Sequence, residues 1–480
     1  MRSVYYLLLI AYYFLPFSAF AQENSLSKKD TADVRFLNQR KFFIYKVDKN
    51  ESLFSISKKF NISQIEIIEF NSELKNDGLK PKMKIWIPAY SLEKKKGEKH
   101  VVVPKEEHHA DETYSVALLL ALNIPKNFSL DLSLVDSNFI MDVLDKETIN
   151  NLEFYEGALL AIDSLKEKKL KVRLHVYDTE NDSLKTAELL KKPEMKQMDI
   201  IISNCSLNVI KLINEFSKTN HLSFSSCSMN AGELLGDNRD AIAMLPASLT
   251  QCKEMGKFVA EKFRHDNCII LKTAMGKENE RSFAFRRGWL DVSEDKLKEV
   301  DYSKYSKELN KVLKAVKDSM STKLNNLIFV PSSNEDFVTG LVNGLKEYSE
   351  EYKITLLGLP TWQYFETIDP ILFELHNVNI FTSSFINYNN SITLGYRKKF
   401  YSLYNIEPTD GAFEGYDMMM ILGSELMQHG RKFIGHLTEK PFTGLYSSYK
   451  FERTSENSFT ENHYISVCRF QNYELKKINE

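Results

Sequence analysis

The sequence is poor in glycine, proline and cysteine: its 480 residues include 18, 12 and 5 of them, respectively. So little glycine and proline, together with 43% hydrophobic residues, excludes collagen-like and disordered chains. The 5 cysteines are too few for a disulfide framework, and their odd number leaves at least one thiol unpaired within the chain. A chain of this length is expected to fold as about three units, each with its own core.

The chain also lacks a large net charge. Its 63 Lys and Arg residues against 65 Asp and Glu residues leave a formal charge of −2. Binding to a nucleic-acid backbone or to an anionic membrane surface draws on an excess of basic residues, so the composition excludes both as charge-driven partners. Any partner must therefore be recognised by a shaped site.

The longest apolar run lies at the N-terminus. Residues 4–17 are almost entirely apolar, follow Arg2, and precede the small residues Ala19 and Ala21. This order predicts a signal peptide over residues 1–21. An uncleaved anchor helix is the less favoured alternative, because the run is shorter than the roughly 20 residues of a membrane helix. We expect an exported mature protein, periplasmic or secreted, without a membrane span.

A small module is expected over residues 42–89. Residues 42–47 alternate as a strand does, and Ser52 is a typical cap for an amphipathic helix over 52–60. Ser63 starts a second short helix with a capping box, and residues 84–88 form a closing strand. The predicted order is strand, helix, helix, strand.

This module resembles the LysM family in its opening strand, its first helix, the end of its second helix at 69–71 and its closing turn and strand at 79–88. The resemblance implies binding of N-acetylglucosamine-containing glycans such as peptidoglycan by two loops. Carried over to this sequence, the glycan-binding residues are Asn50, Glu51, Ser52, Leu53, Leu79, Lys80 and Pro81. Asn50 and Lys82 stand where the family often has glycine. The alternative is a LysM fold kept as a spacer without glycan affinity.

Residues 90–112 are highly charged and lack apolar periodicity, so they are expected to be a linker. From 113 to 480, buried-type strands alternate with amphipathic helices, as in 114–122 followed by the helical spacing of 152–165. This rhythm is typical of the α/β class, with doubly wound, mainly parallel sheets. The length suits two such sheets, hence two lobes.

Several segments of this body resemble type 1 periplasmic binding proteins of the branched-chain amino-acid receptor branch. They are 154–163, 174–178, 224–228, 244–248 and 415–417. The resemblance implies three crossings between lobes and a ligand in the cleft between them. We expect lobe one at about 113–248 and 386–440, and lobe two at about 249–385 and 441–480.

The resemblance also places candidate ligand residues at two turns that follow strands of lobe one. They are Asn204, Cys205, Ser206, Ser226, Cys227 and Ser228. Hydroxyls beside a helix N-terminus suit a carboxylate, although ordinary capping and turn serines look the same. Trp362 follows a strand of lobe two and is a candidate for stacking on the ligand, or else part of the hydrophobic cover. Cys205 and Cys227 follow neighbouring strands, which makes a disulfide between them a hypothesis.

The sequence contains none of the short motifs of hydrolases, metalloenzymes or nucleotide-binding enzymes, so we expect no catalysis, no cofactor and no metal. Two binding functions remain. In the first, a peptidoglycan-associated protein captures a small polar, amino-acid-like solute in its cleft, as the substrate-binding proteins of ABC transporters do. In the second, a ligand-free two-lobed scaffold regulates cell-wall synthesis through an envelope protein partner.

Overall fold

The computed structural model describes residues 33–37, 40–49, 51–60, 62, 67–68, 70–71, 73–74, 78–88, 112–124, 144–273, 276–295, 297–305, 308–472 and 474–479. The predicted signal peptide, Asn50 and most of the predicted linker lie outside these residues. The chain divides into two compact units, 1–105 and 106–480. None of the described helices is long and apolar enough to cross a membrane.

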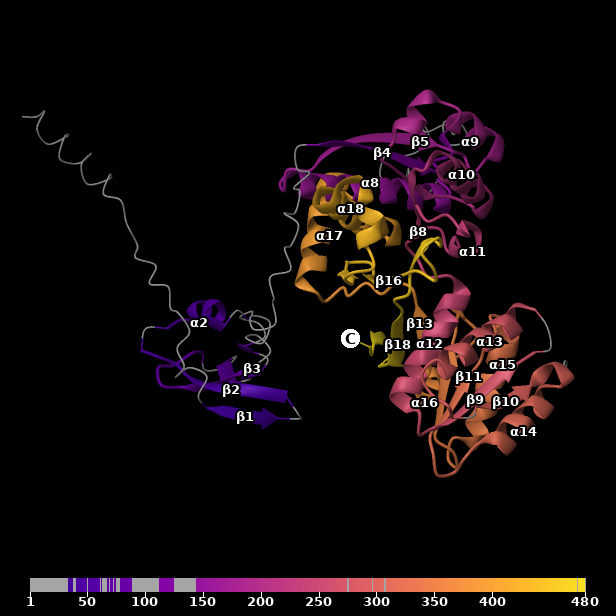
Figure 1. Cartoon of the computed structure of the whole chain (residues 1–480). Helices are drawn as coiled ribbons and strands as arrows, with labels where there is room; N and C mark the ends of the chain where they lie inside the picture. The colour runs from indigo at the N-terminus through magenta and orange to yellow at the C-terminus, as the bar shows by residue number, and fades with distance from the viewer. Residues whose placement is uncertain are drawn as a thin grey trace, which may run out of the picture. The chain divides into compact units, whose positions relative to one another are not determined.

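The first unit is built on a three-stranded antiparallel sheet (Figure 1). Its described elements are β1 (Val34–Leu37), β2 (Arg40–Lys46), α2 (Leu53–Phe60) and β3 (Lys84–Pro88). Side chains from α2, β2 and β3, among them Ile56, Tyr45 and Ile85, share one core. The buried Asn71 ties a loop to β3, because its side chain both donates to the Trp86 carbonyl at 2.9 Å and accepts from the Trp86 N–H at 2.7 Å. The predicted strands and first helix are present, and β1 is an additional strand.

The second unit, the body, contains two seven-stranded sheets flanked by helices, which confirms the predicted α/β class. Lobe one is the sheet of order β16-β17-β8-β7-β6-β4-β5 with its covering helices. Its strands are β4 (Thr113–Leu120), β5 (Lys171–Asp178), β6 (Ile200–Asn204), β7 (Ser223–Ser226), β8 (Ala241–Ala243), β16 (Phe451–Glu452) and β17 (Thr460–Asn462). Its helices are α8 (Lys146–Lys166), α9 (Ser183–Leu190), α10 (Leu207–Asn220), α11 (Gly232–Leu235), α17 (Ser391–Tyr404) and α18 (Asp410–His429).

The pleat of β4 separates the two faces of this sheet. Leu118 and Leu120 pack with α8 and α18, whereas Ala117 and Leu119 pack with α10 and its neighbours. A strand that buries both faces must be apolar on both, which explains the continuous apolar run from Val116 to Leu120.

Lobe two is the sheet of order β10-β9-β11-β12-β13-β18-β19, with only its last two strands antiparallel to their neighbours. Its strands are β9 (Asn267–Lys272), β10 (Lys298–Asp301), β11 (Asn326–Phe329), β12 (Ile354–Gly358), β13 (Asn379–Thr382), β18 (Ser466–Gln471) and β19 (Glu474–Lys477). Its α-helices are α12 (Ser248–Phe263), α13 (Lys277–Leu290), α14 (Leu309–Ser319), α15 (Glu335–Leu345) and α16 (Pro370–Leu375). A short 3₁₀ turn, η6 (Pro360–Tyr364), follows β12.

The chain passes from one sheet to the other after β8, after β13 and after β17. This position of β16 and β17 differs from the expectation that residues 441–480 belong to lobe two. These two short strands extend the sheet of lobe one, because β17 pairs in parallel with β8. Only β18 and β19 join lobe two.

Reciprocal glycine contacts hold one helix pair in each lobe. In lobe one, a Cβ atom added to Gly415 of α18 would lie 2.0 Å from the Phe154 carbonyl oxygen of α8, and one added to Gly157 would lie 2.0 Å from that of Ala412. In lobe two, Gly256 of α12 and Gly288 of α13 contact each other's helix in the same way. The absence of a side chain is what lets these backbones touch.

Candidate functional site

The two loops predicted to bind glycan lie beside each other in the first unit. The Val47 N–H donates to the Met83 carbonyl at 2.8 Å, and the Lys82 N–H donates to the Val47 carbonyl at 2.8 Å. These bonds join the end of β2 to the turn before β3. Lys80 and Pro81 are exposed on that turn, and Leu79 is partly buried. Lys82 occupies the left-handed region with φ of 66°, a conformation that glycine adopts more easily.

Glu51 has a different environment from that of an exposed loop acid. Its side chain is only 7% exposed. The carboxylate accepts hydrogen bonds from the Tyr45 hydroxyl at 2.6 Å and the Asp48 N–H at 3.0 Å, and it pairs with Lys59 at 3.3 Å. Burial, and then the bond to Glu51, raise the pKa of Tyr45 to about 12. Glu51 therefore holds the loop in place by bonds within the protein.

Ser52 caps α2 as predicted. Its hydroxyl accepts from the Ser55 N–H at 3.1 Å, and the Ser55 hydroxyl accepts from the Ser52 N–H at 2.9 Å. Leu53, the first residue of α2, is partly buried. Asn50 lies outside the described residues. Of the predicted glycan residues that the structure describes, Ser52, Lys80 and Pro81 are exposed.

The predicted turns of lobe one line a shallow hollow of about 310 Å³. Asn204, Cys205, Ser206 and Ser228 contribute to it, together with Glu147. Ser226 and Cys227 lie in the core instead, with 0% and 2% of their surfaces exposed. The structure thus brings four of the six predicted residues together.

Hydrogen bonds within the protein occupy the backbone donors of this hollow. The Cys205 N–H donates to the Ser228 hydroxyl at 3.1 Å, and the Ser206 N–H donates to the Asn181 side-chain oxygen at 2.8 Å. The Asn181 amide in turn donates to the Glu147 carboxylate. A ligand carboxylate would have to displace these bonds beside an existing negative charge, so the hollow does not suit the predicted role.

All five cysteines are buried free thiols. Cys205 bonds with the Thr179 hydroxyl, and Cys227 contacts the Met418 sulfur. Cys205 packs with the helices on one face of the lobe-one sheet and Cys227 with those on the other. The two thiols therefore do not meet, contrary to the disulfide hypothesis.

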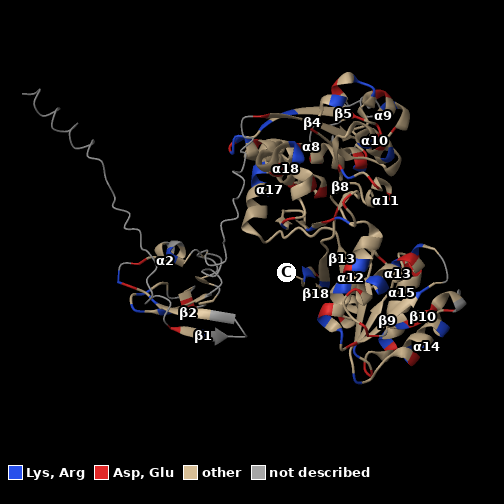
Figure 2. Cartoon of the chain, in the orientation of Figure 1, with Lys and Arg blue, Asp and Glu red and all other residues tan. Residues whose placement is uncertain are grey.

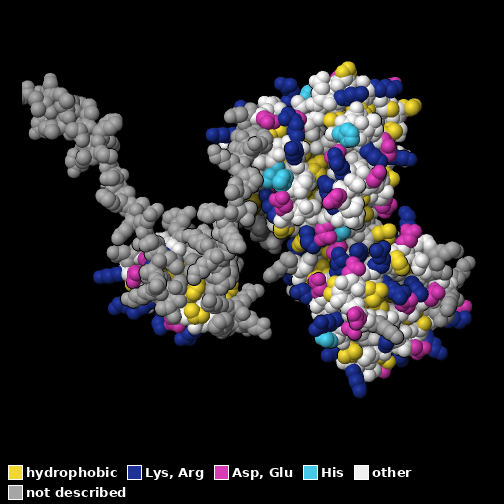
Figure 3. All heavy atoms as spheres, in the orientation of Figure 1, with side chains coloured by type: hydrophobic (Ala, Val, Ile, Leu, Met, Phe, Trp, Pro, Cys, Tyr) yellow, Lys and Arg dark blue, Asp and Glu magenta, His cyan; other side chains and the backbone are white. Residues whose placement is uncertain are grey.

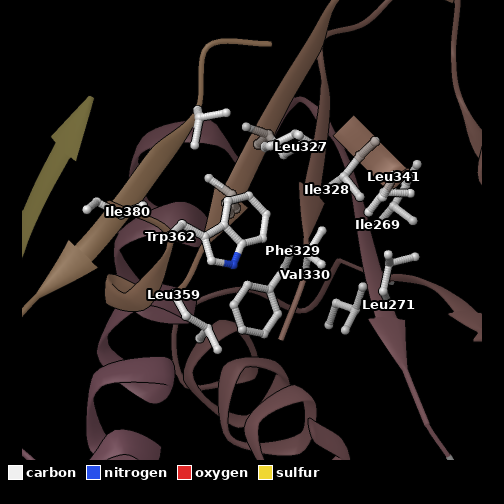
Figure 4. Packing of buried hydrophobic residues seen from close by; sticks show 14 of the residues in the cluster. Ile269, Leu271, Leu327, Ile328, Phe329, Val330, Leu341, Leu359, Trp362 and Ile380 are labelled. Carbon is white, nitrogen blue, oxygen red and sulfur yellow. The ribbon is translucent and has the colours of Figure 1, made fainter. Parts of the chain in front are cut away.

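Trp362 belongs to the core of lobe two. Figure 4 shows its ring among the aliphatic side chains of the sheet. The side chain is 0% exposed, and its indole N–H donates to the Ser332 carbonyl at 2.9 Å. A ring in this position cannot stack on a ligand, so the hydrophobic cover is the correct interpretation. Its neighbour Tyr364, by contrast, is 72% exposed.

A larger hollow, of about 820 Å³, opens where the two lobes meet. Lobe one and the crossings supply residues such as Asn230, Tyr388 and Asp410, and lobe two supplies residues such as Arg281 and Tyr364. We call it the interlobe cleft. Most of its remaining lining is uncharged and polar, including side chains of serine, threonine, asparagine and glutamine. Such a surface offers directed hydrogen bonds to a polar ligand.

The sequence analysis did not find these cleft residues. Asp410 is the first residue of α18, where an acidic residue is common for helix stability alone, and Arg281 is the fifth residue of α13, where a single arginine has no distinctive pattern. Tyr364 was the one signal in the sequence that could have pointed to the cleft. It shares a short turn with Trp362, and such a turn buries one of its two aromatic side chains and exposes the other.

A family comparison identifies the first unit. Residues 45–88 match the family model for the LysM domain. This segment is a LysM domain. The match begins at Tyr45, near the end of β2, and runs to the end of β3, so it includes both loops that the hydrogen bonds of Val47 join. A comparison of the whole chain with curated proteins finds no match.

Solved structures resemble the chain over its body. A putative branched-chain amino acid ABC transporter from Rhodospirillum rubrum aligns with a TM-score of 0.55 and 11% identity, over 76% of this chain and 100% of that one. A branched-chain amino acid ABC transporter periplasmic ligand-binding protein from Burkholderia xenovorans LB400 aligns with a TM-score of 0.52 and 13% identity, over 76% and 94%. The LpoA C-domain from Haemophilus influenzae, a regulator of PBP1A, aligns with a TM-score of 0.49 and 11% identity, over 76% and 100%.

At these identities the likeness shows the fold alone, and the fold is that of periplasmic binding proteins. The chain thus joins a LysM domain to a two-lobed body, as the sequence predicted. Acidic and basic side chains are interspersed over the described surfaces, in keeping with the small net charge (Figures 2 and 3).

Proposed function

We propose that this is an exported, peptidoglycan-associated binding protein whose interlobe cleft captures a small polar solute. The observation that carries the proposal is the interlobe cleft of about 820 Å³, lined from both lobes by polar groups. A two-lobed body can hold a ligand between its lobes, and the LysM domain supplies a means of retention on the wall. The predicted signal sequence supports a periplasmic or secreted location.

The glycan part of the proposal rests on the paired loops of the LysM domain. The exposed turn around Lys80 and Pro81 lies beside the end of β2, so a sugar chain can contact both loops at once. The full mature protein should sediment with purified peptidoglycan. Lys80→Glu should reduce the bound fraction, whereas Lys84→Glu, the same change at an exposed residue on β3, should not.

If equal amounts of the wild type sediment with and without peptidoglycan, the LysM domain has no affinity for the wall and serves only as a spacer. Equal binding of the two lysine variants would place the sugar elsewhere on the domain.

The solute part is tested by thermal shift of the full protein with amino acids, short peptides and soluble muropeptides. A ligand that binds only the folded state raises the unfolding temperature by mass action. No stabilisation by any member of this panel would overturn solute capture.

A specific observation favours the second candidate, a scaffold without a ligand. In the lobe-one hollow, Ser228 and Asn181 already occupy the backbone donors of Cys205 and Ser206. A body that has lost its ligand would act through protein contacts at the cell wall. Failure of the thermal-shift panel, together with capture of a purified cell-wall synthase by the mature protein, would support this candidate.

A further inference from the structure

Three charged residues line the interlobe cleft: Arg281, Asp410 and Glu474. Glu474 has a partner, since its carboxylate lies 3.9 Å from the Lys476 ammonium group. Among the described residues, neither Arg281 nor Asp410 forms an ion pair. Two opposite charges therefore face the same cleft without neutralising each other.

Asp410 is the first residue of α18, where the helix N-terminus partly offsets its negative charge. Its carboxylate receives no hydrogen bond from the described residues. Desolvation by the surrounding protein raises the pKa of Asp410. A cation beside it would stabilise the charged carboxylate.

Two exposed tyrosines belong to the same part of the cleft. Tyr364 of lobe two is 72% exposed, and Tyr388, which follows the second crossing, is 48% exposed. Partial desolvation by the surrounding protein is the main cause that raises the pKa of both tyrosines. The negative charge of Asp410 raises both pKa values further, so this carboxylate acts on both side chains. The Tyr388 ring already holds a cation on one side, with the Arg397 guanidinium carbon 5.4 Å from its centroid. Aromatic faces and a carboxylate together suit an ammonium group.

Arg281 has other neighbours. Its guanidinium donates one hydrogen bond to the Pro331 carbonyl at 3.1 Å, which leaves further N–H groups for a ligand. Burial raises the pKa of Cys252 to about 12, and the charge of Arg281 opposes that rise. The positive and negative charges of the cleft thus act on separate sets of residues. A guanidinium binds a carboxylate with two parallel hydrogen bonds.

The cleft is also large. Its volume of about 820 Å³ lies in the upper part of the range of roughly 300–1,000 Å³ found for drug-sized ligands. A single amino acid would leave most of it unfilled, whereas a peptide of a few residues carries its two charges at opposite ends.

We infer that the cleft binds a short peptide with free ends, its ammonium group against Asp410, Tyr364 and Tyr388 and its carboxylate against Arg281. The inference rests on the proposed capture of a solute and names the class of that solute. It also moves the carboxylate of the ligand from lobe one, where the sequence analysis expected it, to lobe two. The backbone donors of Cys205 and Ser206 in lobe one are occupied, and the cationic side chain that can receive a carboxylate comes from lobe two.

The test uses trialanine, N-acetyl-trialanine, trialanine amide and alanine as probes of the full mature protein in calorimetry. Acetylation removes the ammonium group, and amidation removes the carboxylate. Trialanine should bind at least about tenfold more tightly than either blocked peptide and more tightly than alanine, because each blocked end loses a charge-assisted contact.

Variants assign each end of the peptide to its residues. Asp410→Asn and, separately, Tyr364→Leu should abolish the preference for trialanine over N-acetyl-trialanine. Arg281→Gln should abolish the preference for trialanine over the amide. Asp163→Asn, which removes an exposed carboxylate that pairs with Lys166 on α8, should change neither preference. All four side chains are exposed or only partly buried, so the variants should fold.

The outcomes separate the two proposals. Binding of a solute such as leucine without binding of trialanine would overturn the peptide inference and leave solute capture intact. Equal binding of free and blocked peptides, or unchanged preferences in the Asp410 and Arg281 variants, would also overturn it. Absence of binding by every solute would overturn both.

Discussion

The buried group of Tyr45, Glu51 and Lys59 makes the LysM domain sensitive to a single loop substitution. The side chains of Glu51 and Lys59 are 7% and 8% exposed. The Lys59 ammonium group lies 3.3 Å from the Glu51 carboxylate and 2.8 Å from the Tyr45 hydroxyl. Glu51→Ala would remove this carboxylate from beside a largely buried ammonium group.

Removing one partner of a buried ion pair costs about 3–5 kcal/mol, because the remaining charge stays away from water. The Asp48 N–H and the Tyr45 hydroxyl lose their acceptor as well. A domain of roughly 50 residues has only a few kcal/mol to lose. We therefore expect Glu51→Ala to unfold much of the LysM domain and to abolish sedimentation with peptidoglycan.

Hydrogen exchange measured by mass spectrometry on the full chain separates the domain from the body. Peptides from residues 40–88 should lose protection in Glu51→Ala, while peptides from the lobes keep theirs. Adding Lys59→Met should recover a large part of the loss, because the double variant no longer buries the ammonium group that paired with Glu51. The control is Asp163→Ala, which breaks an exposed pair with Lys166 and should cost less than about 1 kcal/mol.

Two results would refute the reasoning. One is a loss in Glu51→Ala no larger than the loss in Asp163→Ala. The other is a double variant less stable than Glu51→Ala, because it would mean that the packing of the lysine stem outweighs the cost of burying its charge beside the missing Glu51.

Three further predictions concern single positions. Burial raises the pKa of Glu414 to about 8, and Asp410 adds to this rise, so this group should lower stability by up to about 5 kcal/mol as the pH increases from about 4.5 to about 8. In urea unfolding, Glu414→Gln should lose less stability than the wild type over this range, and an equal loss would contradict the assignment. Gly415→Ala should lower the melting temperature sharply, because the added methyl group would clash with the Phe154 carbonyl. The control is Gly395→Ala on α17, where nothing lies within 4 Å of the added atom and the change should stabilise by up to about 1 kcal/mol. Equal melting temperatures of the two variants would argue against the close contact. Lys82→Gly should stabilise the LysM domain by about 1 kcal/mol, because φ of 66° strains any residue with a side chain. The gain should appear as slower hydrogen exchange of the peptides from this domain. Faster exchange would contradict that reason.

The sequence was enough to predict those strands and helices whose apolar residues follow a clear strand or helix pattern. The strand that begins at Tyr114 and the helix that contains Leu152 and Leu165 have strong apolar patterns, and both are present as β4 and α8. The short strands at the C-terminal end were missed. β17 reads Thr-Glu-Asn and owes its existence to pairing with β8, far away in the sequence, so no local pattern could reveal it.

The candidate site was harder to predict for a related reason. Glu51 reads as an exposed loop acid, and only the position of Lys59 one helix later makes it a buried partner. Trp362 and Tyr364 are two residues apart in one short turn, and the contacts of the sheet below decide which ring is buried. Arg281 and Asp410 come from different lobes, so their shared cleft depends on the crossings of the chain.

The glycine contacts of the two lobes impose an order on the folding of the body. In lobe two the contact joins α12 to α13, which are consecutive helices, so a newly made chain can form it early at little cost in loop entropy. In lobe one the contact joins α8 to α18, and more than half of the chain separates Gly157 from Gly415. Lobe one therefore cannot complete its core until residues of α18 have been synthesised. Until then the apolar face of β4 lacks the helix that covers it in the folded protein, so Leu118 and Leu120 are open to contacts with other chains.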